Sequence, residues 1–274
     1  MSENVMNRMT EEEYRKYPAV NKSALWEMRK SPMHYKWALE NPGEDTPALA
    51  LGRAVHMAVL QPGEFTEHYI DAPEGIDRRT KDGKAAWAEF LEKAGTKEVM
   101  SSKDYYDTLD ISQAVWAQAR EMLEGCECEV PLFWDDKRTG IACKCRVDAM
   151  KELDDKFLVI DLKTTTDAQI SAFTRNAIAY GYHVQAAHYI NGVIANGLNH
   201  DKPVEWWFVA VEKKPPYAAS VIRMDQGMID EGQHQLNSLM DMLDKCRTFD
   251  EWPGYPERVM ELPKWAAQSE EDEE

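Results

Sequence analysis

Two hydrophobic patterns divide the chain near residue 125. Before this point, NKSALWEMRKSPMHYKWALENP is interpreted as two short helices, and TPALALGRAVHMAVLQPGEF as a third. Small apolar residues around Gly52 and Ala54 indicate that the third helix is tightly packed. Asn21 or Ser23 can cap the first helix, Ser31-Pro32 can start the second, and the third is expected to end near Pro62. Two further helices are predicted, AAWAEFLEKAG and SSKDYYDTLDISQAVWAQAREML, the latter capped by Ser101 or Ser102.

From residue 126 the pattern changes to short alternating or continuous apolar runs. CECEVPLFWD and TGIACKCRVDAM predict two strands around a turn from Asp135 to Gly140, and KFLVIDLKT predicts a third. A helix is expected over AFTRNAIAYGYHVQAAHYINGVIANG, with Gly197 as its C-cap. Two strands, VEWWFVAVEKKPPY and AASVIRMD, and a closing helix, MIDEGQHQLNSLMDMLDKCRTF, follow. This order predicts an α/β fold with a mixed central sheet flanked by helices and preceded by a helical segment.

Length and charge refine this interpretation. The 274 residues suit one domain over 1–265, with a helical part to about 125 and a sheet-bearing core after it. Residues 266–274 are expected to form a disordered acidic tail, because five acidic residues end the chain. The net charge of −17 argues against nucleic-acid binding, since an acidic protein repels DNA at long range. A local basic patch or bound cations can reverse that field within a cleft.

The sequence also bears on cellular location and on the cysteines. No stretch has the roughly 18 apolar residues of a membrane helix, and the polar N-terminus predicts a cytoplasmic protein rather than a secreted one. The C-x-C spacing on predicted strands differs from the usual C-x₂-C of zinc loops, which disfavours a metal cluster. Cys143 and Cys145 alternate with cationic residues and are expected to face the core. The cysteines concerned are Cys126, Cys128, Cys143 and Cys145.

Candidate chemistry lies where FLVIDLKT follows CRVDAM. Asp161 and Lys163 share one face of a strand because side chains alternate with a period of two. A hairpin of this size brings Asp148, at the expected end of the preceding strand, beside Asp161. Two adjacent carboxylates repel unless a cation lies between them, and Mg²⁺ favours such oxygen ligands. The alternative is a local ion pair between Asp161 and Lys163, with Asp148 as a turn residue.

An ordered series of motifs resembles the PD-(D/E)XK nuclease superfamily. IDLKT after RVD is similar to its core motif, ALGRAVHMAVL to the helix with a metal-binding histidine in RecB-like nucleases, and HVQAAHY to their Q-x-x-x-Y element. With NKSALWEMRKSPMHYKWAL, DRRTKDGK and FWDDKRTGIACKCRVD, the chain resembles the RecE-type exonucleases, as in the C-terminal nuclease domain of exonuclease VIII. The resemblance covers roughly residues 15 to 245.

The resemblance implies roles for individual residues. Lys163 would position the attacking water, Gln185 would help place the nucleophile or the DNA backbone, and Tyr189 would support it. Glu129 matches an acidic position of the family, although it could instead pair with a nearby Lys or Arg. The implied metal ligands are His56, Asp148, Asp161, the Leu162 backbone carbonyl and Glu129.

The resemblance further implies a Mg²⁺-dependent exodeoxyribonuclease, with Mn²⁺ as a substitute, encoded by a phage or prophage in a bacterial host. It would degrade linear double-stranded DNA from 5′ to 3′ and leave 3′ overhangs for a RecT-like single-strand annealing protein. A homo-oligomeric ring, expected to be a tetramer, would enclose the DNA. One alternative is a Cas4-like or RecB-like single-strand nuclease. Another is a catalytically silent DNA-binding or assembly protein.

A basic loop, DRRTKDGK, precedes one of the predicted helices. Cations before a helix N-terminus favour the binding of anions, so the loop is interpreted as a binding site for DNA phosphates. The alternative is a solvated loop without a partner. The DNA-binding candidates are Arg78, Arg79, Lys81 and Lys84.

Overall fold

The structure, a computed structural model, describes residues 9–41, 43 and 46–263. The predicted domain boundary at 265 and the predicted acidic tail at 266–274 lie outside these residues, so both stay predictions.

The N-terminal part is helical, and side-chain caps fix where its helices begin. Asn21 accepts a hydrogen bond from the Ala24 amide at 2.8 Å. Ser31 caps the next helix, and Ser101 rather than Ser102 caps the long helix before the sheet. The helices are α2 (Glu11–Lys16), α3 (Lys22–Trp26), the 3₁₀ turn η1 (Glu27–Arg29), α4 (Pro32–Glu40), α5 (Pro47–Leu60), α6 (Pro62–His68), α7 (Lys81–Ala94) and α8 (Ser102–Leu123).

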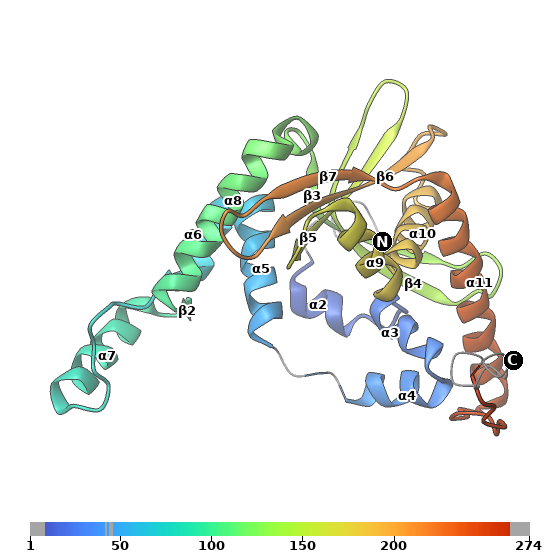
Figure 1. The fold of residues 1–274 in the computed structure, drawn as a ribbon, viewed down its shortest axis with the longest axis horizontal. Coiled ribbons are helices and arrows are strands. Elements are labelled where there is room, and N and C mark those ends of the chain that lie inside the picture. The colour runs from blue at the N-terminus through green and yellow to red at the C-terminus, as the bar shows by residue number, and fades with distance from the viewer. Residues whose placement is uncertain (1–8, 42, 44–45, 264–274) are drawn as a thin grey trace, which may run out of the picture.

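A five-stranded mixed sheet forms the centre of the molecule (Figure 1). Its order is β3 (Glu127–Asp135), β4 (Ala142–Glu152), β5 (Phe157–Thr165), β6 (Val204–Glu212) and β7 (Ala219–Arg223). Strands β5 and β6 are parallel and the other neighbours antiparallel. Parallel neighbours need a crossover, which α9 (Ile170–Ala179) and α10 (Tyr182–Ala195) supply, and α11 (Gln226–Phe249) follows β7. The predicted α/β fold with flanking helices is confirmed.

Helices cover both faces of the sheet. On one face, α9 and α10 pack around Trp206 and Phe208. On the other, α5 and α8 pack against Ile160 and Leu162. A fully buried side chain of this size stabilises the fold by roughly 1.5–3 kcal/mol. The polar residues that interrupt this apolar interior therefore need a separate explanation.

The pairing of strand β4 with β5 ends next to Asp148. The two strands pair between Ala149–Glu152 and Phe157–Ile160. Farther back along β4, the Lys144 amide donates to the Val20 carbonyl at 2.8 Å, so the N-terminal segment takes the place of β5. The sheet is thus open on one side of Asp148, where the segment before α3 pairs with β4 in place of β5.

The expectation that the two aspartates end their strands is wrong. Asp148 lies inside β4 and Asp161 inside β5. Val147 packs in the core under α10, whereas Ala149 packs in the core under α5 and α8, so the side-chain alternation of β4 shifts at Asp148. This shift directs Asp148 into the gap between the two strands.

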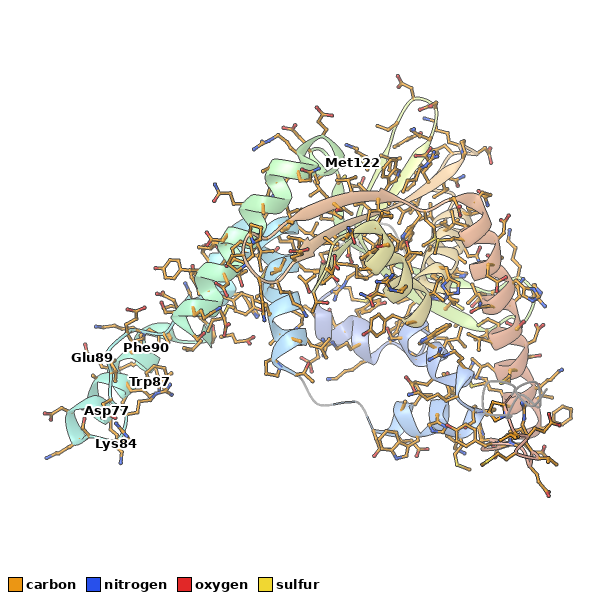
Figure 2. All side chains as sticks on the ribbon, viewed as in Figure 1. Asp77, Lys84, Trp87, Glu89, Phe90 and Met122 are labelled. Carbon is orange, nitrogen blue, oxygen red and sulfur yellow. The ribbon has the colours of Figure 1, made fainter. Side chains whose placement is uncertain are left out.

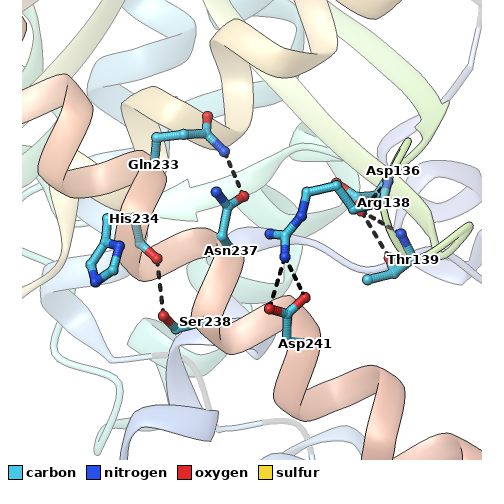
Figure 3. A network of polar contacts seen from close by, with 8 residues as sticks. All are labelled: Asp136, Arg138, Thr139, Gln233, His234, Asn237, Ser238 and Asp241. Atoms are coloured by element: carbon cyan, nitrogen blue, oxygen red, sulfur yellow. Dashed lines mark hydrogen bonds and ion pairs between the residues drawn. The ribbon is translucent and has the colours of Figure 1, made fainter.

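The predicted turn between β3 and β4 is present and is tied to α11 (Figure 3). Asp136 Oδ1 accepts hydrogen bonds from the backbone amides of Arg138 and Thr139 at 3.1 and 3.0 Å. The Arg138 guanidinium donates to both carboxylate oxygens of Asp241 at 2.8 Å. A bidentate pair of this kind has a defined geometry, so it fixes the hairpin on the helix.

The segment predicted as one helix from Ala172 to Gly197 forms two. They are separated by Gly181, whose φ is 68° and whose added Cβ would lie 2.7 Å from ring atoms of Trp26. Glycine is therefore required there for both conformation and space. At the far end, Gly197 has φ 69° and the Leu198 amide donates to the Val193 carbonyl, which is the predicted C-terminal cap.

Helix α7 projects from the body as an arm (Figures 1 and 2). It is joined to the rest through the parallel pair β1 (Tyr69–Asp71) and β2 (Glu98–Met100). Within the described part of the chain, none of the four hydrophobic clusters includes a residue of α7. Its Trp87 and Phe90 rings instead pack on each other, with centroids 5.2 Å apart.

The arm begins four residues earlier than predicted. Thr80 caps α7 by accepting a hydrogen bond from the Gly83 amide at 3.0 Å, so the helix starts at Lys81. Lys81 and Lys84 consequently belong to the first helical turn and not to a loop. The sequence did not reveal this cap because Thr80 lies among charged residues, and the apolar residues that indicate a helix begin only at Ala85.

Helices α10 and α11 approach most closely at Gly232, where an added Cβ would lie 2.1 Å from the His183 carbonyl oxygen. We expect Gly232→Ala to lower the free energy of unfolding by about 1–3 kcal/mol, the usual cost of overpacking. Urea denaturation measures it. Gly227→Ala in the same helix is the control, because its Cβ would meet nothing nearer than 3.7 Å. Equal midpoints for both variants would contradict this close packing.

Candidate active site

Three metal-ligating groups from three elements converge beside the opening in the sheet. His56 Nδ1 on α5 lies 3.6 Å from Asp148 Oδ2 on β4 and 4.0 Å from Glu129 Oε1 on β3. One ligand atom from each of these residues lies within 4.8 Å of the other two, and all three side chains are half-buried. Residues so far apart in sequence meet here because the sheet places β3 and β4 side by side against α5.

Glu129 is held in an unusual backbone conformation. Its φ is 54°, which is uncommon for a residue other than glycine. It lies opposite Asp148, since its neighbours Cys128 and Val130 pair with Ala149 and Val147. Arg146 Nε is 3.1 Å from Glu129 Oε2. Glu129 is therefore both close to the metal candidates and paired with an arginine, the two possibilities that the sequence left open.

Asp161 is almost fully buried, at 1% exposed, in the middle of β5. Its Oδ1 accepts a hydrogen bond from Gln185 Nε2 at 2.5 Å, and its Oδ2 lies 2.5 Å from Lys163 Nζ. The expected placement of Asp161, Lys163 and Gln185 together is thus observed. Asp161 lies next to, and not within, the group of three potential ligands, because Lys163 and Gln185 hold its carboxylate.

The two aspartates are adjacent, as the hairpin length predicted. The Leu162 amide, which follows Asp161, donates to Asp148 Oδ2 at 2.9 Å. This bond replaces a strand-to-strand bond where β4 and β5 separate. The role of Asp161 and of the Leu162 carbonyl as metal ligands stays a prediction.

The carboxylates of the site are strongly perturbed. Burial, and to a smaller extent the charges of Asp148, Glu64 and Asp161, raise the pKa of Glu129 to about 8. Burial also raises the pKa of Asp161 to about 6, although the Lys163 ammonium acts in the opposite direction. Burial lowers the pKa of Lys163, but Asp161 and Asp148 together lift it above its usual value. A cation bound at the site would favour the ionised form of both carboxyl groups.

This donor set fits a divalent cation. Carboxylate oxygens are the ligands that Mg²⁺ and Mn²⁺ prefer, and imidazole suits several first-row metal ions. His56, Glu129 and Asp148 would hold the cation.

These pKa values predict how the stability of the metal-free protein depends on pH. Both carboxyl pKa values exceed those of an unfolded chain, near 4. As the pH rises, the unfolded chain therefore loses these protons at a lower pH than the folded protein does. The stability that the protonated carboxyl groups contribute is lost over this range. In EDTA, we expect the melting temperature to fall from pH 5 to pH 8, and Mg²⁺ to raise it more at pH 8. Differential scanning calorimetry of wild type and Glu129→Gln tests this, since the variant should show a smaller fall.

Tyr189 has a different environment from the one implied. It shares a helical face with Gln185, but its ring packs edge-on against Trp206 with centroids 5.7 Å apart. Burial raises its pKa well above the usual value, so it stays neutral. These contacts support α10 on the sheet, which fits an indirect role in placing Gln185.

Sequence reasoning missed three residues at the site: Tyr182, Arg146 and Lys22. Tyr182 precedes Gln185 by three positions on α10, and its ring centroid lies 5.1 Å from Lys163 Nζ. Arg146 is two positions from Asp148 on one strand, so both could have been found from helical and strand spacing. Lys22 gave no such signal, because the Val20–Cys143 bridge that places it joins distant parts of the chain.

The predicted DNA-binding cations lie on the arm, at its far end from β5 (Figures 1 and 2). Arg79 Nε is 2.9 Å from Asp77 Oδ1, and the Arg78 guanidinium lies 4.0 Å from the centroid of the Trp87 ring. Both arginines are therefore partly engaged within the arm. Their role, with that of Lys81 and Lys84, stays a prediction.

The cysteines lie on both faces of the sheet. Cys143 and Cys145 are buried on the α10 side, as expected. Cys126 and Cys128 pack against the opposite core, under α8. The four thiols consequently do not converge on one point.

The sheet topology and the side chains along β4 and β5 define the PD-(D/E)XK-like class of α/β proteins. The chain belongs to the family described as "PDDEXK-like domain of unknown function (DUF3799)", whose model matches residues 21–262. This range includes every residue of the candidate site. No helix in the described part of the chain has the length and apolar character needed to span a membrane.

One solved structure shows the same fold. A crystal structure from Eubacterium rectale, described as a "putative exonuclease", is 14% identical, covers 93% of this chain and 96% of its own, and has a TM-score of 0.63. A second, described as "SSO0001", is 17% identical over 69% of this chain and 84% of its own, but its TM-score of 0.29 carries no argument. No curated protein matches this chain.

Proposed function

We propose that this protein is a divalent-metal-dependent nuclease that hydrolyses phosphodiester bonds in DNA. The observation that carries the proposal is the convergence of His56, Glu129 and Asp148 next to the Asp161–Lys163 pair. A structural ion pair alone does not account for a second and a third carboxylate at this point. Membership of a PDDEXK-like family supports the same activity.

Each residue of the candidate site is assigned a separate role in hydrolysis. A divalent cation at His56, Glu129 and Asp148 would supply positive charge to offset that of the phosphate and to promote the ionisation of water. Lys163 orients the attacking water and donates to a phosphate oxygen, because its ammonium lies at the opening of the sheet. Gln185 fixes the Asp161 carboxylate, and Tyr182 covers the Lys163 side chain. Such preorganised donors lower the barrier because they need not reorient during the reaction.

The finer proposal is an exodeoxyribonuclease of the RecE type. It would degrade linear double-stranded DNA from 5′ to 3′ and leave 3′ overhangs for recombination by a RecT-like annealing protein. The assembly would be a homo-oligomeric ring, which places the few cations of an acidic chain around a channel. The description of the Eubacterium rectale protein as a "putative exonuclease" supports attack at an end.

Linear duplexes labelled at one chosen end, with Mg²⁺ or Mn²⁺, test this function. We expect early release of label from 5′ ends, retention at 3′ ends, and no attack on a covalently closed circle of the same sequence. Equal cutting of the circle would overturn the exonuclease proposal. Absence of hydrolysis with both metals would overturn the nuclease proposal itself.

A further inference from the structure

The N-terminal helices carry a local excess of positive charge. Residues 15–38 contain six lysines and arginines against one acidic residue, a net charge of +5 in a chain of −17. Lys16 pairs with Glu12 and Lys30 with Glu27. Cations on α3, η1 and α4 remain beyond these pairs, and two of them, Lys22 and Arg29, lie on either side of Trp26.

Three residues form a stripe along α3 and η1. Lys22, Trp26 and Arg29 are spaced four and three positions apart, so they share a helical face. The Trp26 ring centroid lies 4.9 Å from Lys22 Nζ and 4.6 Å from the Arg29 guanidinium carbon. Lys22 is buried and Arg29 is exposed. The stripe therefore leads from the interior to the surface.

The inner end of the stripe lies near the candidate active site. Burial, with a smaller effect of the Lys163 charge, lowers the pKa of Lys22 to about 8, although the charge of Asp161 acts in the opposite direction. This proximity follows from the pairing of Val20 with β4 two residues earlier. Lys22 is thus a second buried lysine beside the Asp161–Lys163 pair, although it belongs to a different layer of the fold.

A line of aromatic residues runs beside the cationic stripe. Lys22 Nζ donates to the Tyr180 carbonyl at 2.5 Å, and the Tyr180 side chain is 59% exposed. The Tyr180 and Tyr182 rings are 5.9 Å apart, and Tyr182 lies 5.1 Å from Lys163 Nζ. Exposed aromatic rings beside cations are the elements that proteins use to stack bases and hold phosphates.

We propose that Arg29 and the stacking platform Tyr180, which the buried Lys22 holds in place, form the track that holds the cut DNA strand beside the active site. This inference rests on the proposed nuclease function and assigns the substrate contacts to the N-terminal helices. The track reaches the catalytic pair through the Tyr180–Tyr182 contact, whereas the cations of the arm lie far from that pair.

Binding of fluorescein-labelled single-stranded and duplex DNA in Ca²⁺, followed by anisotropy at several salt concentrations, tests the track without hydrolysis. We expect Arg29→Ala to weaken binding and to reduce the log–log salt slope by roughly 0.7–0.9, the share of one phosphate contact. We expect Tyr180→Ala to weaken single-strand binding by roughly tenfold with an unchanged slope, and Tyr180→Phe to restore it. Both positions are exposed, so folding is preserved.

Lys137→Ala, at an exposed lysine of the β3–β4 turn, is the charge-matched control and should bind as wild type. Equal affinities for wild type, Arg29→Ala and Tyr180→Ala would overturn the track, as would a loss confined to Arg78→Ala on the arm. Hydrolysis in Mg²⁺ is measured separately on the same proteins. If the two variants bind DNA more weakly but wild type does not hydrolyse it, the track is supported and the nuclease function is refuted. If wild type hydrolyses DNA and the variants bind it as tightly as wild type, the nuclease function is supported and the track is refuted.

Discussion

Asp161→Asn is expected to abolish hydrolysis while the protein stays folded. The substitution keeps the size of the side chain and removes a buried charge whose pKa is already raised to about 6. It also leaves the Lys163 ammonium without its carboxylate partner, which lowers the stability of the fold, so activity is measured well below the melting temperature. The rate should nevertheless fall by roughly 10³-fold or more, at the upper end of the range for one preorganised group, because Lys163 loses the carboxylate that orients it at 2.5 Å.

Release of end label from linear duplex DNA in Mg²⁺ measures this loss, and circular dichroism checks the fold. The matched control is Asp155→Asn, the same chemical change at an exposed turn between β4 and β5. It should retain the wild-type rate. Wild-type activity of Asp161→Asn would refute the assigned role of this carboxylate.

Lys163→Met is the second substitution with a large expected effect. It keeps the length of the side chain but removes the ammonium, so we expect a rate lower by roughly 10²-fold or more. The buried Asp161 carboxylate also loses the cation that lowers its pKa. The pH profile of the remaining activity should therefore move to higher pH.

Single-turnover rates across pH 6–9 and calorimetric titration with Mg²⁺ at pH 8 separate the two effects. Lys163→Arg, which restores the charge, should recover part of the rate and the original profile. If Lys163→Met instead lost Mg²⁺ binding at pH 8 and kept its pH profile, Lys163 would serve the metal site as a structural element.

Local rules in the sequence were sufficient for the elements and for part of the site. Caps at Asn21, Ser31 and Ser101 mark helix starts because their side chains satisfy free amides at the helix end. Strand alternation placed Asp161 and Lys163 on one face, whereas Gln185 was placed beside them by the resemblance of its helix to the Q-x-x-x-Y element. These predictions depend on residues that are close in sequence.

Other features depend on contacts between distant segments, which local patterns do not encode. The break at Gly181 is enforced by Trp26, more than 150 residues earlier. The shift of β4 at Asp148 depends on Val20, which replaces β5 as its neighbour. Lys22 is near the site for the same reason.

The arm has a consequence for how the stability of this protein should be measured. Helix α7 shares no hydrophobic cluster with the body in the described ranges, so its 14 residues gain little from the global core. An isolated helix of this length is marginal in water. The arm can therefore unfold locally, well before the cooperative transition of the sheet. Helix ellipticity then records two events, and a two-state fit to it would underestimate the unfolding enthalpy of the body.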